Sequence, residues 1–355
     1  MNKTLEPQEV SLITAQDKHT KDGETTLGEV RARVARALAR PEADQEAREA
    51  EYLHCLEQGG FIPAGRILSA AGTDIGATLI NCFVQPIADS ATENAPGQYP
   101  AIYTALAEAA ETMRRGGGVG YDFSRIRPRG AKVKGTNSRA SGPVSFARVF
   151  DKSCETVESA GARRGAQMGV LRCDHPDIED FITAKSAKGE LNNFNLSVGV
   201  SDAFMQAVDA DADFELVHKA APTDEFPGAY QREDGMWVYR KVRARDIWEQ
   251  IMRNTYSHAE PGVLFIDQMN AENNLYYCET IEATNPCAEQ PLPPYGCCCL
   301  GSINLAMHVV DPFTEQARFD FDGFSKTVRT AVRMLDNVLD ESLWPLEKQR
   351  QEAMA

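Results

Sequence analysis

Three polar side chains alternate along the stretch "NPCAE" near the C-terminal end of the chain. They are the amide of Asn285, the thiol of Cys287 and the carboxylate of Glu289. If the stretch is extended, side chains two residues apart point the same way, so all three would share one face. An amide can orient a hydroxyl group, a carboxylate can take its proton, and a thiol can do redox or radical chemistry. The spacing fits a catalytic loop and a turn with a buried cysteine equally well.

A run of three cysteines follows this stretch after several prolines, which stiffen the connection. In an extended strand, Cys297 and Cys299 would share one face and Cys298 would take the other. Structural zinc sites usually show two separated pairs of Cys or His ligands. Three adjacent thiols would ligate one metal ion poorly, so we predict no metal site here.

Two glycine-rich segments could face a phosphate group. The first, "RRGGGVGYD", follows a helical pattern and precedes a strand. Nucleotide-binding fingerprints run in the opposite order, from strand through glycines to helix, so this segment indicates a helix C-terminus and a tight turn. The second, residues 161–169 ("GARRGAQMG"), carries two arginines between glycines. Its pattern fits both a nucleotide-facing loop and a solvated turn.

The composition limits the class of protein. The chain has 355 residues, 43% hydrophobic and 25% charged, which is ordinary for a soluble globular protein. Its net charge of −15 argues against long nucleic acid as a partner, whereas small phosphorylated ligands remain possible. The polar N-terminus does not resemble a signal peptide, and no stretch is apolar enough to span a membrane. We therefore expect a cytoplasmic protein whose thiols stay reduced.

Strand patterns alternate with helical patterns along most of the chain, which predicts an α/β fold with mainly parallel strands. Residues 1–25 are polar and are predicted to be disordered or frayed. Residues 26–60 are predicted to form a helical region of two helices broken at Pro41. We find no linker within residues 61–355, so we expect one continuous domain there.

Read in order, these segments resemble the catalytic subunit of ribonucleotide reductases, most closely the adenosylcobalamin-dependent class II enzymes. The resemblance covers roughly residues 60–346. It runs through "FIPAGRIL", "NCFVQPIADS", "RRGGGVGYDFSRIRPRG", "SGPVSF", "RRGAQMGVLRCDHPDIEDFI", "NNFNLSV", "GVLFIDQMN", "NPCAEQPLPPYG" and "CLGSINL". The last two are the most specific and favour class II over class I. The resemblance implies the N-terminal portion of a ten-stranded α/β barrel, a half-barrel plus a central finger loop, preceded by a small helical region.

The resemblance assigns catalytic roles to five residues. It implies that Cys287 is the thiyl-radical cysteine that removes the 3′-hydrogen of a ribonucleotide substrate. Glu289 would be the general base on the 3′-hydroxyl, and Asn285 would hydrogen-bond the substrate. Cys82 and Cys298 match the reducing pair, which would supply a proton and two electrons and end as a disulfide. The radical must come from a cofactor, which in class II enzymes is adenosylcobalamin.

Further matches concern the binding of substrate and effector. Family members choose among substrates by binding a dNTP effector at a separate site near a dimer interface, which implies a homodimer. The residues matched to this effector site, or to the loop between it and the substrate, are Asp89, Arg163, Arg164 and Gln167. The residues matched to the substrate site are Asn81 and Gly135.

Complete members of the family are roughly twice as long. They continue into a second half-barrel and commonly end with a cysteine pair that re-reduces the active-site disulfide. Because a half-barrel leaves strand edges uncovered, we expect the C-terminal half of the reductase as a separate chain, together with an external dithiol reductant. Two alternatives stay open: a class I catalytic subunit fragment, and a non-catalytic nucleotide-binding regulatory half.

Overall fold

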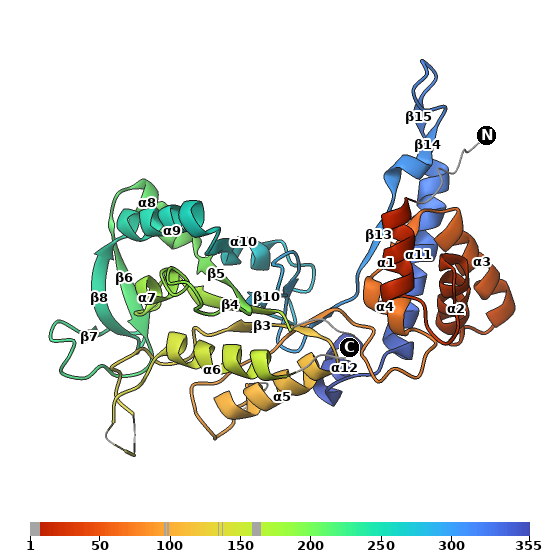
Figure 1. Cartoon of the computed structure of the whole chain (residues 1–355). Helices are drawn as coiled ribbons and strands as arrows, with labels where there is room; N and C mark the ends of the chain where they lie inside the picture. The colour runs from red at the N-terminus through yellow and green to blue at the C-terminus, as the bar shows by residue number, and fades with distance from the viewer. Residues whose placement is uncertain (1–7, 96, 98, 134, 137, 158–164) are drawn as a thin grey trace. The chain divides into compact units, whose positions relative to one another are not determined.

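The computed structural model of the chain describes residues 8–95, 97, 99–133, 135–136, 138–157 and 165–355 (Figure 1). The chain forms two compact units. Unit 1 comprises Met1–Asn81 and Cys298–Ala355, and unit 2 comprises Cys82–Cys297. The last part of the chain thus belongs to the same compact unit as the N-terminal helices. Within the described part of the chain, no helix is long and apolar enough to cross a membrane.

A parallel sheet forms the centre of unit 2 and confirms the predicted α/β class. Its strands, in spatial order, are β2 (Cys82–Val84), β3 (Gly118–Asp122), β4 (Gln167–Arg172), β5 (Phe194–Val200) and β9 (Gly262–Phe265). Each neighbouring pair of these strands is parallel. The short strand β12 (Cys297–Cys298) lies outside β2 at the edge of the sheet.

Helices cover this sheet and bury a shared apolar core. They are α5 (Ile102–Arg114), α6 (Pro143–Thr156), α7 (Ile178–Ile182), α8 (Asp202–Asp209), α9 (Ala244–His258) and α10 (Ile266–Ala271). In Figure 1, α5 and α6 run side by side along the sheet. Apolar residues at helical spacing face inward, as Ala105, Ala109 and Met113 do on α5. Tyr121 of β3 packs edge-on against Phe150 of α6, with ring centroids 5.0 Å apart.

A small antiparallel sheet in unit 2 was not predicted. It consists of β6 (Asp213–His218), β8 (Trp237–Arg243) and β7 (Tyr230–Gln231), in that spatial order. Buried residues are few in these strands, so their apolar pattern is weak. The sheet matters for the site because His218, at the end of β6, is buried.

Unit 1 is mainly helical. Its helices are α1 (Glu9–Lys18), α2 (Leu27–Ala39), α3 (Gln45–Glu57), α4 (Gly65–Ala70), α11 (Phe321–Glu341) and α12 (Glu347–Ala353). Short strands and a 3₁₀ turn complete it. Strand β1 (Phe61–Pro63) pairs with β13 (Gly301–Ile303). The turn η1 (Leu305–His308) then leads into β14 (Val309–Val310), which pairs with β15 (Arg318–Phe319). The helices α2 and α3 confirm the predicted pair.

The N-terminal segment differs from the prediction of a frayed stretch over residues 1–25. Residues 1–7 lie outside the described residues, and α1 forms immediately after them. Ala15 of α1 is buried, which ties the helix down. Helix α2 then begins with a capping box, in which Thr26 and Glu29 satisfy each other's backbone N–H groups.

Candidate active site

Residues 285–289 form a turn and not the extended stretch expected from the alternating pattern. The Ala288 N–H donates to the Asn285 carbonyl at 3.0 Å, and Ala288 has a φ of 65°. Asn285 is therefore fully buried, whereas Cys287 and Glu289 are exposed. The expectation that the three side chains share one face is wrong. The physical reason is Pro286, whose fixed φ suits the second position of a turn that Asn begins.

The turn is the tip of a short hairpin, which we call the finger hairpin (residues 283–292). Its strands are β10 (Ala283–Thr284) and β11 (Pro291–Leu292). Asn285 closes the tip, since its N–H donates to Gln290 O at 3.1 Å and its Oδ1 accepts from Gln290 N–H at 3.0 Å. The Nδ2 of Asn285 is buried without a hydrogen-bond partner among the described residues. A buried donor without a hydrogen bond is energetically costly, so its presence at this tip requires an explanation.

The finger hairpin lies across β3 where two glycines open one face of the sheet. A Cβ at Gly120 would overlap the Thr284 carbonyl oxygen, and a Cβ at Gly118 would lie 2.8 Å from Pro286 Cγ. Both glycines face the same way because they are two residues apart on a strand. On β5, Asn195 donates through Nδ2 to Pro286 O at 2.7 Å and holds the hairpin there.

The first glycine-rich segment therefore has two roles. Gly116 adopts a φ of 92° after helix α5, as expected for a helix C-terminus and tight turn. Gly118 and Gly120 admit the finger hairpin, a role that the sequence analysis missed. The signal was present, because the intervening residues Val119 and Tyr121 are buried in the helix-covered core and leave the glycines on the other face.

The structure brings the thiol of Cys82 to the finger hairpin. Cys82 begins β2 and is half-buried. Its Sγ lies 3.3 Å from the position that a Cβ of Gly118 would take, and Pro286 Cγ lies 2.8 Å from that same position. Pro286 immediately precedes Cys287. Cys82 and Pro286, which are about 200 positions apart in the sequence, thus lie close together on one face of the sheet.

Asn81 and Cys298 are paired through their backbones in unit 1. The Asn81 N–H donates to the Cys298 carbonyl at 3.1 Å. The Oδ1 of Asn81 accepts from the Leu300 N–H at 3.4 Å, so this side chain already has a partner. Cys298 is buried, whereas Cys297 and Cys299 are half-buried, which is the alternation expected of an extended strand.

Asp89 lies beyond the carboxyl end of β2 and holds Arg127. Its Oδ1 accepts from the Arg127 N–H at 2.9 Å, and both carboxylate oxygens lie 3.1 Å from Arg127 Nε. A cavity of about 640 Å³ opens beside it, lined among others by Arg125, which follows β3, and by Arg172, the last residue of β4. Ligands commonly bind outside the carboxyl ends of parallel strands. The segment 124–125, continued by Arg127 behind it, therefore forms one wall of a candidate binding site.

Two buried histidines hold this wall. Nε2 of His218 donates to Arg125 O at 3.1 Å, and Nε2 of His175 donates to Ile126 O at 3.0 Å. Nδ1 of each ring accepts a backbone N–H, which fixes the proton on Nε2. Burial lowers the pKa of His175 to about 3, and it lowers the pKa of His218. Both rings are therefore neutral positioning groups, which the sequence analysis did not identify.

The other predicted residues lie apart from Cys287 or outside the description. Gly135, with a φ of 89°, lies in a loop closed by the bridge between Lys132 and Arg139. That loop follows the carboxyl end of β3, the end of the sheet near Asp89. Gln167 begins β4 and is buried. It accepts from the Tyr121 hydroxyl at 2.8 Å and donates to Phe150 O at 3.3 Å, so its side chain is committed to the core.

The two loop arginines, Arg163 and Arg164, lie outside the described residues. In the described part of the chain, no group of three or more His, Cys, Asp or Glu side chains could hold a metal ion.

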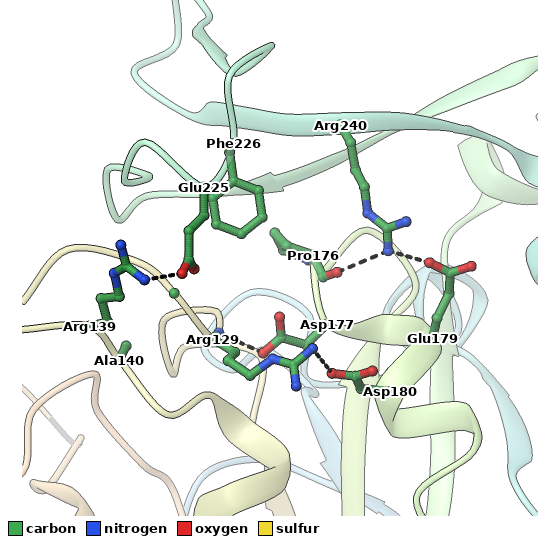
Figure 2. Close-up of a pocket in the computed structure, with 11 residues that line it drawn as sticks. Arg129, Arg139, Ala140, Pro176, Asp177, Glu179, Asp180, Glu225, Phe226 and Arg240 are labelled. Atoms are coloured by element: carbon green, nitrogen blue, oxygen red, sulfur yellow. Dashed lines mark hydrogen bonds and ion pairs between the residues drawn. The ribbon is translucent and has the colours of Figure 1, made fainter.

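A second cavity, of about 580 Å³, lies between the 129–140 loop and α7 (Figure 2). Figure 2 shows that each arginine on its wall points at a carboxylate. The pairs are Arg129 with Asp180 at 3.0 Å, Arg139 with Glu225, and Arg240 with Glu179. Because every guanidinium is already neutralised by its own partner, this cavity lacks the excess charge that an anion would need. None of the predicted site residues that the structure describes lines it.

Two family models match most of the chain. Residues 80–355 match "Ribonucleotide reductase, barrel domain". The chain belongs to the ribonucleotide reductase family. Residues 14–76 match "Ribonucleotide reductase, all-alpha domain", which corresponds to the helices at the start of unit 1. The predicted family and the predicted N-terminal portion of its α/β barrel are thereby confirmed.

Several ribonucleotide reductases align with most of the chain. The vitamin B12-dependent ribonucleoside-diphosphate reductase of Mycobacterium tuberculosis is 39% identical over 348 residues, which are 96% of this chain and 46% of that protein. The enzyme of the same name from Thermoplasma acidophilum is 39% identical over 289 residues, 81% of this chain and 34% of that protein. The ribonucleoside-diphosphate reductase subunit alpha of Chlamydia trachomatis is 26% identical over 341 residues, 90% of this chain and 31% of that protein.

The chain therefore spans less than half the length of these relatives. Its identity to the vitamin B12-dependent enzymes is higher than its identity to the chlamydial subunit alpha, in agreement with the resemblance to class II.

Proposed function

We propose that this chain is the part of a ribonucleotide reductase that carries the radical cysteine. Completed by a second polypeptide with the remaining half of the barrel, it would reduce ribonucleotides to 2′-deoxyribonucleotides. The observation that carries the proposal is the finger hairpin on the glycine face of β3. There the Cys82 thiol lies beside Pro286, and Cys287 is exposed at the tip.

In the proposed reaction each side chain moves a stated atom. Cys287, as a thiyl radical, takes the hydrogen atom from C3′ of the substrate and returns it at the end. Glu289 takes the proton of the 3′-hydroxyl, and the buried Nδ2 of Asn285 donates a hydrogen bond to the substrate. Cys82 and Cys298 supply two electrons and the protons with which the 2′-hydroxyl leaves as water. The net result is a ribonucleotide and a dithiol converted to a deoxyribonucleotide, a disulfide and water.

The exposed tip of the finger hairpin is consistent with a radical that a separate, bound group generates at Cys287. Cys287 is exposed, so its hydrogen atom can be removed by a bound cofactor. Adenosylcobalamin supplies, when bound, the one-electron chemistry that turns a thiol into a thiyl radical. The names of the two relatives at 39% identity support this cofactor over a separate radical-generating protein.

The cavity beside Asp89 supports a dNTP effector site. Its volume of about 640 Å³ is in the range of small-molecule sites. Asp89 would bind the nucleotide, and the loop with Arg163 and Arg164 would relay its identity toward the substrate at Asn81 and Gly135. Gln167, whose side chain is held in the core, would anchor the end of that loop to the sheet. A homodimer and an external dithiol reductant complete the proposed assembly. Asp89→Asn should weaken dTTP binding at least tenfold in calorimetric titration, and unchanged affinity would exclude this assignment.

A reconstitution assay tests the proposed function. The chain is mixed with a polypeptide carrying the second half of the barrel, a ribonucleotide, dithiothreitol and a dNTP, with or without adenosylcobalamin. We expect deoxyribonucleotide only when both polypeptides and the cofactor are present. Product without cobalamin, on adding a radical-generating subunit, would support a class I fragment. Folded, associated halves that bind dNTP but form no product in either mixture would support a regulatory role.

A further inference from the structure

The segment that leads into the finger hairpin is held by a cluster of three side chains, Tyr99, Arg125 and Glu282. Nη2 of Arg125 is ion-paired with Oε1 of Glu282 and donates to the Tyr99 hydroxyl oxygen at 2.7 Å. That hydroxyl donates to Oε2 of Glu282 at 3.0 Å. The guanidinium carbon lies 3.8 Å from the centre of the Tyr99 ring. Both carboxylate oxygens of Glu282 are therefore fixed.

The hydroxyl of Tyr99 remains a donor at every relevant pH. Burial, and then the neighbouring Glu282 carboxylate, raise the pKa of Tyr99 to about 12. The Tyr99 hydroxyl therefore keeps its proton, and its role as a donor to Glu282, between roughly pH 6 and pH 9.

Glu282 is joined directly to the strand that carries the finger. It precedes β10 (Ala283–Thr284), and the Thr284 carbonyl lies against the backbone of Gly120. The sheet prevents this segment from moving inward, and Pro286 follows with a fixed φ. A displacement of Glu282 is therefore passed along a short, stiff stretch to the turn at Cys287.

The same cluster forms part of the wall of the cavity beside Asp89. Tyr99, Arg125 and Glu282 all line that cavity together with Asp89. Arg125 is two residues from Arg127, which Asp89 binds through both backbone and side chain. A ligand that binds against Asp89 therefore contacts the segment that holds Glu282.

We propose that Tyr99, Arg125 and Glu282 are positioning residues that couple occupancy of the cavity beside Asp89 to the order of the finger hairpin. The inference rests on the proposed function, in which this cavity binds a dNTP. A bound nucleotide immobilises the cavity wall. Because Arg125 is part of that wall and holds Glu282, residues 283–290 also become less mobile. By reciprocity, a change in the finger alters nucleotide affinity by the same factor.

Hydrogen exchange with and without nucleotide tests the coupling. Amide exchange of residues 283–290 is measured in the full chain, alone and with saturating dTTP or dATP, and binding is measured separately by calorimetry. The variants are Glu282→Gln and the milder Tyr99→Phe, which removes one hydroxyl. The matched control is Glu249→Gln, which breaks an exposed ion pair with Arg253 on α9. Circular dichroism verifies that each variant is folded.

We expect nucleotide to slow exchange of residues 283–290 at least threefold in the original chain and in the Glu249→Gln control. In Glu282→Gln and Tyr99→Phe, nucleotide should still bind, but this slowing should largely disappear. A folded Glu282→Gln or Tyr99→Phe chain that binds nucleotide and slows exchange as the control does would overturn the coupling alone. No binding of either nucleotide by the original chain would overturn the proposed effector site and, with it, the coupling.

Discussion

Gly120 allows the finger hairpin to lie on the sheet. Because a Cβ there would overlap the Thr284 carbonyl oxygen, Gly120→Ala must displace backbone, and backbone cannot swing aside as a long side chain can. We expect the free energy of unfolding to fall by about 2 kcal/mol or more, as for other overpacked sites. Urea denaturation of the chain measures this change.

Gly199→Ala is the matched control, since it adds the same methyl group to β5. Its nearest neighbour would be Val170 Cγ1 at 3.6 Å, an ordinary van der Waals contact. We expect a change of less than about 1 kcal/mol. Equal losses in the two variants would contradict the close approach of the hairpin to β3.

His175 should make the chain less stable as the pH falls. Its folded pKa of about 3 lies below the ordinary value of about 6.5, so only the unfolded state takes up this proton between those limits. Between pH 7.5 and pH 5 the residue should therefore remove about 2 kcal/mol of stability. His175→Gln lacks this titration, so its stability deficit against the original chain should shrink by that amount over the same range.

Denaturation of both chains at the two pH values measures the effect. Burial raises the pKa of Asp122 to about 6, which opposes His175 by favouring the folded state at low pH. That opposing contribution is present in both chains and cancels in the comparison. A deficit that stays constant with pH would contradict a buried neutral His175.

The residues of the candidate site were identifiable by type, but their arrangement was not. Asn285, Cys287 and Glu289 alternate in sequence, a pattern that is also typical of an extended strand. The Asn-Pro pair at the start of a turn was the better signal. The two histidines were missed because nothing in the sequence around them distinguishes a buried, fully bonded ring from an exposed one.

Elements with a clear apolar repeat were predictable, and those without one were not. Helices α2 and α5 each present a strong apolar face, and the predictions found them. The antiparallel strands β6 and β8 were missed because their faces are only partly buried. Helix α1 was missed because it has no apolar face, and Ala15 is its only buried residue.

The position of helix α2 in unit 1 depends on Arg33. Its guanidinium pairs with Glu24 at 2.8 Å, and both side chains are only 13% exposed. It also donates to the backbone carbonyls of His19, Leu68 and Ala71. Arg33→Met leaves a largely buried carboxylate without its charged partner and removes a shared donor from three carbonyls. We expect the free energy of unfolding to fall by about 3 to 5 kcal/mol in urea denaturation.

Arg36, one turn along the same helix, provides the control. Its side chain is 68% exposed and pairs with Glu49 at 3.2 Å. Because exposed pairs contribute little, Arg36→Met should cost less than about 1 kcal/mol. Arg33→Lys should behave more like Arg33→Met than like the original chain, since an ammonium cannot reproduce the five directed donors. A small loss on Arg33→Met would show that α2 is held by packing alone.

At the scale of the whole molecule, unit 1 is built from two stretches of the chain that are far apart in the sequence. Residues 298–355 complete unit 1, although 216 residues of unit 2 separate them from the N-terminal helices. No change of composition marks this return, so the sequence analysis expected one domain over 61–355. The boundary falls between Cys297 and Cys298, within the run of cysteines that first suggested chemistry.

We propose that Cys287 is the radical cysteine of a reductase completed by a second polypeptide. The most direct measurement is deoxyribonucleotide formation by Cys287→Ser in the reconstituted mixture with adenosylcobalamin, compared with Cys278→Ser. Both cysteines are exposed and nine residues apart, so general effects of losing a thiol are matched. We expect no product from Cys287→Ser and undiminished product from Cys278→Ser. Product from Cys287→Ser at the rate of the original chain would exclude Cys287 as the radical cysteine.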